Sequence, residues 1–194
     1  MPTTLLLIRH GETDWNVEGR YQGQADPPLN ERGREQARRL ARKLEQDPPD
    51  IIYTSPLKRA YETARIIADH LRRPLYVEPR LKEIHQGEWQ TLLHTEIARR
   101  YPEAWDSWHT TPWETQIPGG ETLKEVQKRV YEAIDEIIQR HPGKRIAIVA
   151  HRIPLALIKI RYQGLDPARV RQIEIPNTYV EEITIPIPSD ESIS

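Results

Sequence analysis

Three short, almost wholly apolar runs constrain the fold of this chain most, because segments of helical period lie between them. The runs fall at residues 4–8 (TLLLI), 51–53 (IIY) and 146–150 (IAIVA). A strand without polar alternation is buried on both faces, as in a parallel sheet covered by helices. We therefore expect an α/β fold: a three-layer α/β/α sandwich with a mostly parallel central sheet and an antiparallel edge strand.

Capping signals place the helices between these runs. Asn30 is expected to be the N-cap of a helix to about residue 44, and Thr122 that of a long helix ending at 141–143. Ser55 as N-cap and Pro56 at the first helical position open a third helix. Pro154 lies near the start of a fourth. Short strands are expected at three further places: 75–77, 170–175 and 179–185.

The chain has 194 residues, which favours a single domain. We expect that domain to span 1–185, with a flexible C-terminal tail over 186–194. Residues 10–29 show no helical period and are expected to form a long loop. Residues 80–120 contain one short helix near 96–101 but otherwise resist assignment. Irregular segments of this length usually form a lid or a wall of a site.

Composition excludes several classes of site and partner. The chain has no cysteine, which removes disulfides, thiolate zinc sites and cysteine nucleophiles. A net charge of −1 favours neither nucleic acid nor a membrane surface as a partner. The first residues lack the pattern of a signal peptide, and no apolar run approaches the ~20 residues of a membrane span. We expect a cytoplasmic protein with a small-molecule partner, and a homodimer through an edge strand.

Basic residues follow the ends of three predicted strands. Arg9 and His10 follow the first, Arg59 lies in the first turn of the helix after the second, and His151-Arg152 follows the fourth. The carboxyl ends of parallel strands meet at one edge of the sheet, where ligands bind. Histidines and arginines together predict an anion site, and phosphate matches the arginine fork best. The free backbone N–H groups at the start of the helix after Ser55 are expected to contribute to this anion site.

The same residues suggest a chemistry. Neither a GxxxxGK[ST] loop nor carboxylates with metal-ligand spacing accompany them, so an imidazole is the natural nucleophile. His10 suits this role, since Gly11 beside it leaves room for phosphate oxygens, and His151 would stabilise charge on the transferring group. Glu83, after the third strand, is the first choice for the acid, with Glu12 as its rival.

Six motifs carry a family resemblance. In order along the chain they are RHGETDWN, RYQGQADPPLNERG, SPLKRAYETA, RLKEIHQGEW, PGGETL and VAHRIPL. In order and spacing they resemble the histidine phosphatase (phosphoglycerate mutase-like) superfamily over roughly residues 4–180. RHG alone would be a weak signal, but the combination is highly specific.

The resemblance implies a role for each matching position. His10 would be the phosphorylated nucleophile, and Glu83 would protonate the leaving oxygen and then activate water. Three basic residues would hold the phosphoryl group: Arg9, Arg59 and His151. Three further residues would line the substrate side: Asn16, Gln22 and Gly23. The family works without metal, so the resemblance implies no metal and no other cofactor.

Departures from the family pattern bear on the substrate. Arg152 follows the second histidine where the family commonly has Gly, and it is either a ligand for a substrate carboxylate or second phosphate, or a rim charge. This motif looks more like metal-independent phosphoserine phosphatases than mutases. His85 also departs from the usual acid motif, and its role stays open.

We expect a phosphatase that hydrolyses small phosphomonoesters of the phosphoserine, sugar phosphate or phosphoglycerate class through a phosphohistidine. A cofactor-dependent phosphoglycerate mutase is the first alternative, although its longer closing insertions are absent from 194 residues. A non-catalytic module that binds phospho-ligands is the second.

Overall fold

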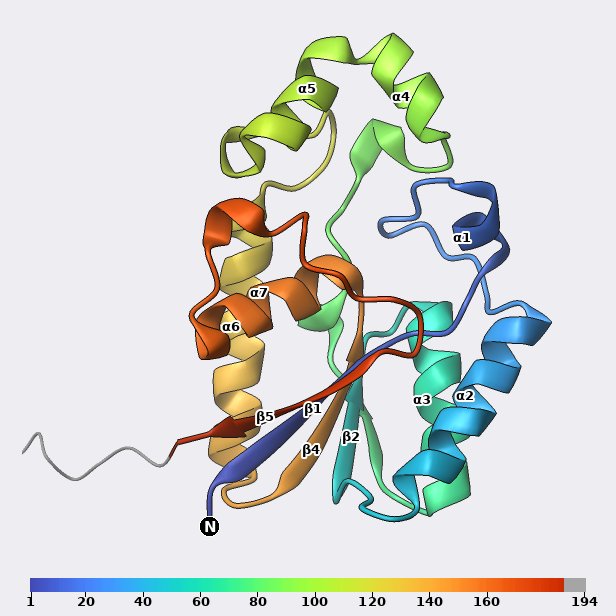
Figure 1. Cartoon of the computed structure of the whole chain (residues 1–194), viewed down its shortest axis with the longest axis vertical. Helices are drawn as coiled ribbons and strands as arrows, with labels where there is room; N and C mark the ends of the chain where they lie inside the picture. The colour runs from blue at the N-terminus through green and yellow to red at the C-terminus, as the bar shows by residue number, and fades with distance from the viewer. Residues whose placement is uncertain (187–194) are drawn as a thin grey trace, which may run out of the picture.

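A five-stranded sheet in the order β3-β2-β4-β1-β5 forms the centre of the computed structural model, which describes residues 1–186 (Figure 1). Four strands are parallel: β1 (Thr3–Arg9), β2 (Ile51–Thr54), β3 (Leu75–Val77) and β4 (Arg145–Ala150). The fifth, β5 (Val180–Ile185), pairs antiparallel with β1 at the edge. The predicted mostly parallel sheet with one antiparallel edge strand is confirmed.

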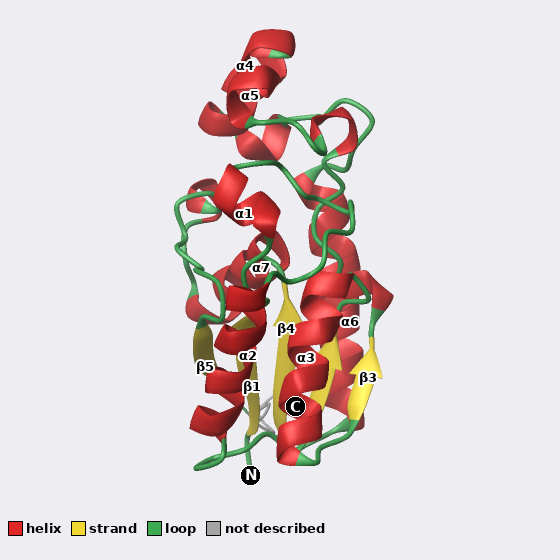
Figure 2. Ribbon diagram, turned by 90° about the vertical axis from the view of Figure 1, so that its right-hand side faces the viewer, coloured by secondary structure: helices red, strands yellow, loops and turns green. Residues whose placement is uncertain are grey.

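Helices cover both faces of this sheet. Helices α2 (Glu31–Leu44) and α3 (Lys58–Leu71) cover one face, and α6 (Leu123–Arg140) and α7 (Arg152–Gln163) the other (Figures 1 and 2). Successive side chains of β1 divide between the two layers. Leu6 and Ile8 pack with α2 and α3, whereas Leu5 and Leu7 pack with α6 and α7. A strand segment buried on both sides is apolar at successive positions, as residues 5–8 of β1 are.

Two of the predicted helix caps are correct. The side chain of Asn30 accepts a hydrogen bond from the Gly33 amide at 2.8 Å, and that of Thr122 accepts one from the Glu125 amide at 3.3 Å. The predicted start of α3 at Ser55-Pro56 is wrong, because α3 begins at Lys58. The hydroxyl of Ser55 instead forms a hydrogen bond with His151.

Three predicted segments differ from the structure. The expected loop 10–29 contains a short helix, α1 (Asp14–Glu18). Residues 170–175, all of them described, form turns instead of a strand, because β5 already pairs with the edge of β1. The segment 80–120 is more regular than expected, with α4 (His94–Arg100) and α5 (Pro102–Thr110). The expected tail lies outside the described residues, apart from Pro186.

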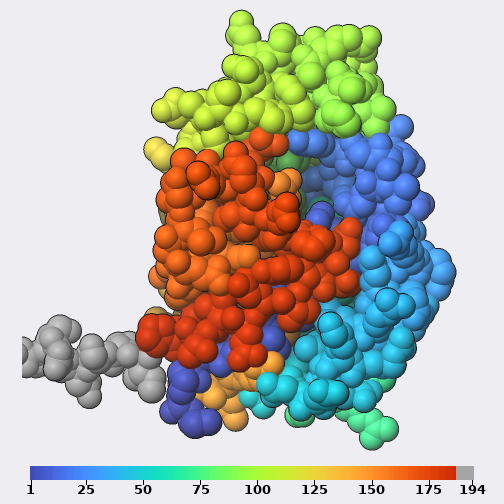
Figure 3. Space-filling model, viewed as in Figure 1, coloured from blue at the N-terminus to red at the C-terminus, as the bar shows by residue number. Residues whose placement is uncertain are grey.

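Helices α4 and α5 with their flanking turns form a cap, residues 87–114, beyond the carboxyl ends of the parallel strands (Figure 1). Trp89, fully buried, holds it together, with its ring centroid 5.7 Å from Trp105 and 6.4 Å from Trp108. A hollow opens beneath the cap, between the N-terminal segment and α7 (Figure 3). Within residues 1–186, no helix is both long and apolar enough to cross a membrane.

Candidate active site

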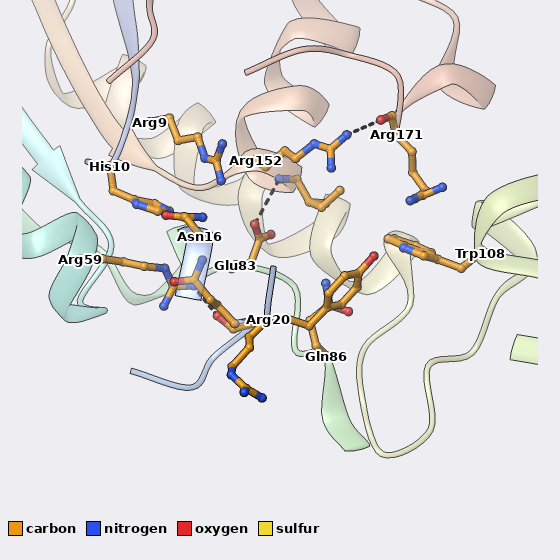
Figure 4. A pocket seen from close by; sticks show the side chains of 14 residues that line it. Arg9, His10, Asn16, Arg20, Arg59, Glu83, Gln86, Trp108, Arg152 and Arg171 are labelled. Carbon is orange, nitrogen blue, oxygen red and sulfur yellow. Dashed lines mark hydrogen bonds between the residues drawn. The ribbon is translucent and has the colours of Figure 1, made fainter. Parts of the chain in front are cut away.

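The hollow under the cap is a pocket at the carboxyl ends of the parallel strands (Figure 4). Most of the site residues expected from the sequence line it. They are Arg9, His10, Asn16, Gln22, Gly23, Arg59, Glu83 and Arg152. His151 lies directly behind His10, and the centroids of the two imidazole rings are 5.2 Å apart. The expected convergence of histidines from the ends of β1 and β4 is therefore present.

His10 follows β1 and is only 2% exposed. Its Nδ1 lies 2.7 Å from the carbonyl oxygen of Gly11. Because a carbonyl can only accept, Nδ1 carries the proton and Nε2 keeps its lone pair. Burial, with Arg9 and Arg59 adding to it, lowers the pKa of His10 well below its usual value. The ring is therefore neutral, with an unprotonated nitrogen, at ordinary pH.

His151 precedes α7 as its N-cap and is fully buried. Its Nε2 lies 2.8 Å from the hydroxyl of Ser55, at the end of β2. Its Nδ1 is buried without a hydrogen-bond partner in the described part of the chain. Burial and the nearby Arg59 lower the pKa of His151 well below its usual value. A buried polar atom without a partner is costly, so Nδ1 is open to one further hydrogen bond.

Arg9 and Arg59 place two guanidinium groups beside His10. Arg59 is 1% exposed and donates to the carbonyl oxygens of Gly23 at 2.6 Å and Ala25 at 2.8 Å. Arg9 donates to the carbonyl oxygen of Ile175 at 2.7 Å. Burial lowers the pKa of each arginine to about 10, so both stay charged at neutral pH. Within residues 1–186 neither forms a salt bridge, so their charge is available to an anion.

Glu83 is the carboxyl group of the pocket. It accepts hydrogen bonds from the backbone amides of Ile84 at 2.8 Å and Ile153 at 3.5 Å. Burial raises its pKa although these amides, Arg59 and Arg9 act in the opposite direction. A carboxyl group with a raised pKa can hold a proton closer to neutral pH, as a general acid must.

The remaining expected residues, Gly23, Gln22 and Asn16, also line the pocket. Gly23 has φ +52° and presents its carbonyl to Arg59, and a Cβ there would come within 2.7 Å of the Gln86 side chain. Gln22 accepts a hydrogen bond from the Thr13 hydroxyl at 2.8 Å, and Asn16 accepts one from the Asn177 amide at 3.3 Å. Their positions are therefore fixed by packing and by side-chain hydrogen bonds.

Three residues considered from the sequence do not line the pocket. Glu12, the rival acid, lies outside the pocket and accepts a hydrogen bond from Asn30 at 3.1 Å. Gly11 makes room for α2 and not for phosphate, because a Cβ there would lie 2.6 Å from the carbonyl oxygen of Gly33. His85, whose role was open, lies outside the lining, and its Nδ1 accepts a hydrogen bond from the Gly87 amide at 2.9 Å.

The structure also corrects the expectation that the helix after Ser55, α3, adds positive potential to the site. The Lys58 amide at the start of α3 donates to the Asp26 carboxylate at 2.6 Å, and the Leu57 amide donates to Ser55. The start of α7 lines the pocket instead, through Arg152 and Ile153. The favourable helix dipole at the site therefore comes from α7.

Sequence reasoning missed the outer half of the pocket. This half is lined by Arg20, Tyr21, Gln86, Trp108, Arg171 and the predicted Arg152. Arg171 lies in the turn that was expected to be a strand, and Trp108 comes from α5, which was not predicted. No local sequence signal marks these residues, because the path of the chain brings them together. Among residues 1–186 there is no group of three His, Cys, Asp or Glu side chains suited to a metal.

Comparison with known proteins gives consistent matches. The model of the histidine phosphatase superfamily (branch 1) matches residues 5–186. Phosphoserine phosphatase 1 of Hydrogenobacter thermophilus is 40% identical over 162 residues, which cover 84% of this chain and 77% of the relative. The metal-independent phosphoserine phosphatase of Arabidopsis thaliana is 40% identical, over 82% of this chain and 68% of the relative.

A solved structure agrees with these relatives. Bacillus stearothermophilus YhfR has a TM-score of 0.87 at 38% identity, over 93% of this chain and 90% of that chain. The expected class of enzyme, a phosphoric monoester hydrolase with a histidine nucleophile, is confirmed by the family and by the relatives named phosphoserine phosphatase. The chain belongs to branch 1 of the histidine phosphatase superfamily.

Proposed function

We propose that this protein hydrolyses a small phosphomonoester in two steps through a phosphoryl group on Nε2 of His10. One observation carries the proposal: an unprotonated imidazole nitrogen shares a pocket with a carboxyl group of raised pKa and with two guanidinium groups that have no salt-bridge partner among residues 1–186. These are a nucleophile, an anion-binding charge and an acid. The two relatives named for phosphoserine support a substrate of that size.

In the first step, Nε2 of His10 attacks phosphorus and the bond from phosphorus to the ester oxygen breaks. The proton of Glu83 moves to the departing oxygen, which leaves as an alcohol. Arg9 and Arg59 bind the equatorial oxygens, where charge accumulates. The unpartnered Nδ1 of His151 is the further donor that we assign to a phosphoryl oxygen.

In the second step, the Glu83 carboxylate takes a proton from a water molecule. The resulting hydroxide attacks phosphorus, the bond from phosphorus to Nε2 breaks, and inorganic phosphate leaves. His10 regains its lone pair and Glu83 its proton. Atoms and charges balance over the cycle without a metal, so activity is expected to survive a strong chelator. Loss of activity that a divalent cation restores would contradict this mechanism.

Release of inorganic phosphate from purified protein tests the proposal. The substrates are p-nitrophenyl phosphate, phosphoserine and 3-phosphoglycerate, and rapid quenching at alkaline pH is expected to trap a phosphoryl group on the peptide that contains His10. With a bisphosphoglycerate primer added, exchange between phosphoglycerate isomers without phosphate release would favour the mutase. Absence of turnover across all three substrates would favour the non-catalytic binding module.

The cytoplasmic location, the homodimer and the single domain over 1–185 stay predictions from the sequence. Fractionation of cells, light scattering of the purified protein and the cooperativity of its unfolding, in that order, test them.

A further inference from the structure

Arg171 lines the outer half of the pocket with a cation that is separate from Arg9 and Arg59. It follows a turn after Pro167–Arg169, and its guanidinium carbon lies 5.3 Å from the centroid of the Trp108 ring. It also donates to Nε2 of His109 at 3.2 Å. His109 can accept there because its Nδ1 donates to the carbonyl oxygen of Trp105. Two residues of α5 therefore fix the guanidinium in position without neutralising it.

Arg152 brings a further positive charge to the same wall. Its guanidinium donates to the backbone carbonyl of Arg171, which links the start of α7 to the turn that carries Arg171 (Figure 4). Burial and the nearby Arg152 both lower the pKa of Arg171, although the Tyr21 phenol acts in the opposite direction. The positive charges of Arg152 and Arg171 therefore repel each other, and both residues line the outer half of the pocket.

The charges of the pocket do not balance. Five arginines line it, and among residues 1–186 only Arg20 has a salt-bridge partner, Glu18 at 2.5 Å. Glu83 is the one carboxyl group in the lining, and its raised pKa favours the neutral form. A phosphoryl dianion offsets Arg9 and Arg59. Arg152 and Arg171 are left without a carboxylate partner among residues 1–186, and half-buried cations of this kind are unfavourable unless a ligand supplies the missing charge.

The position of Arg152 and Arg171 relative to Glu83 identifies the part of the substrate that these two arginines would contact. The amide of Ile153, next to Arg152, lies 3.5 Å from the Glu83 carboxylate. Under the proposed function Glu83 protonates the leaving oxygen, so the leaving group lies beside Glu83. In Figure 4, Glu83 lies between the inner residues, Arg9 and His10, and the outer residue Arg171. The leaving group therefore extends toward Arg152 and Arg171.

We propose that Arg171, together with Arg152, binds a carboxylate on the leaving group and selects phosphomonoesters that carry one. The guanidinium fork of Arg171 suits a carboxylate, which can accept two parallel hydrogen bonds. This inference rests on the proposed function and narrows its substrate class.

Two pairs of substrates test the proposal, since each pair differs at the carboxylate. Phosphoethanolamine is phosphoserine without its carboxylate. Glycerol 3-phosphate has a hydroxymethyl group in the place of the carboxylate of 3-phosphoglycerate. The unmodified protein is expected to prefer the acidic member of each pair in kcat/KM by about 10- to 100-fold, the effect of one charge-assisted hydrogen-bonded pair. Arg171→Met is expected to remove most of that preference, and Arg171→Lys to leave an intermediate one.

Arg169→Met is the matched control, because Arg169 is exposed on the same turn and lies outside the pocket. It is expected to keep the full preference. Thermal unfolding identifies any variant that fails to fold, in which case Arg171→Lys carries the test. An unchanged preference in folded Arg171→Met, or no preference in the unmodified protein, would overturn the subsite while leaving the phosphatase in place. Failure to hydrolyse any of these substrates, p-nitrophenyl phosphate included, would instead overturn the proposed function and this inference with it.

Discussion

The inner and outer halves of the pocket are built in different ways. In the inner half, His10, Arg59 and His151 are at most 2% exposed and lie at strand ends or in the first turn of a helix. In the outer half, Arg152 and Arg171 are half-buried, and Arg171 rests on side chains of the cap. The inner half depends on the sheet, and the outer half depends on segments outside the sheet.

This difference separates the two tasks of the enzyme. The phosphoryl group is common to every phosphomonoester, so its binding groups can be as rigid as the sheet that carries them. The leaving group varies between substrates, and the groups proposed to bind it lie on the turn before β5, which packs against the cap, and at the start of α7. Such segments can change in sequence without disturbing the register of β1 and β4. We therefore expect changes in the inner half to lower all activities and changes in the outer half to alter selectivity.

The largest effect is expected for His10→Ala, which removes the nucleophile. We expect kcat for every phosphomonoester to fall by about 10⁴-fold or more, because the covalent route is lost. Steady-state assays with p-nitrophenyl phosphate and phosphoserine measure this loss. His70→Ala is the matched control, since His70 is exposed on α3 and pairs with Glu45. Equal turnover of His10→Ala and unmodified protein would exclude a phosphohistidine at this position.

Much of the sheet could be predicted because its central strands contain continuous apolar runs, residues 5–8 in β1 and 146–150 in β4. Residues 170–175 misled the prediction, since an alternating pattern suits an edge strand as well as a half-buried turn. In the structure Ile175 offers its carbonyl to Arg9, and β5 pairs with the adjacent edge of β1. Helix α5 was missed because its packing depends on Trp89, which is distant in sequence from Trp105 and Trp108.

The inner site could be predicted for the same physical reason as the sheet. Parallel strands end at one edge, so residues after β1 and β4 must meet there. The outer site could not, because the place of Arg171 depends on the path of the chain from α7 to β5. The role of Gly11 could not be predicted from the sequence either, because its close contact with the backbone of Gly33 depends on the fold. Contacts between loops leave no periodic pattern to read.

The second largest effect is expected for Glu83→Gln, which removes the acid. We expect kcat/KM for phosphoserine to fall by about 10²- to 10⁴-fold. The loss for p-nitrophenyl phosphate is expected to be smaller, because nitrophenolate leaves without a proton. Since the pKa of Glu83 is raised and that of His10 lies well below its usual value, kcat/KM is expected to fall only on the alkaline side. Glu83→Gln is expected to lose that alkaline decline.

A matched carboxyl group outside the pocket provides the control for this prediction. Glu12→Gln removes the other candidate acid, whose partners are Asn30 and Arg32 on the far side of the loop. It is expected to keep both the rate and the pH profile of the unmodified protein. The assignment of the acid to Glu83 would be wrong if Glu12→Gln, and not Glu83→Gln, lost the dependence on the leaving group.

The smallest effect concerns stability and separates the buried inner half from the rest of the molecule. His10 stays neutral in the folded state below pH 6.5, because burial lowers its pKa, whereas the same imidazole takes up a proton in the unfolded chain. Its contribution to stability is therefore present above pH 6.5 and is lost as the pH falls. Between pH 6.5 and 5.5 the free energy of unfolding should fall by about 1 kcal/mol more in the unmodified protein than in His10→Gln.

Urea unfolding at the two pH values measures this difference, and the comparison of variants cancels the titration of the other groups. His70→Gln, on the exposed surface of α3, removes an imidazole that is not buried and is expected to follow the unmodified protein. If His10→Gln lost stability in parallel with the unmodified protein, the ring of His10 would be open to protonation in the fold. The lone pair that the proposed nucleophile needs would then be unavailable below neutral pH, because the same nitrogen would hold a proton.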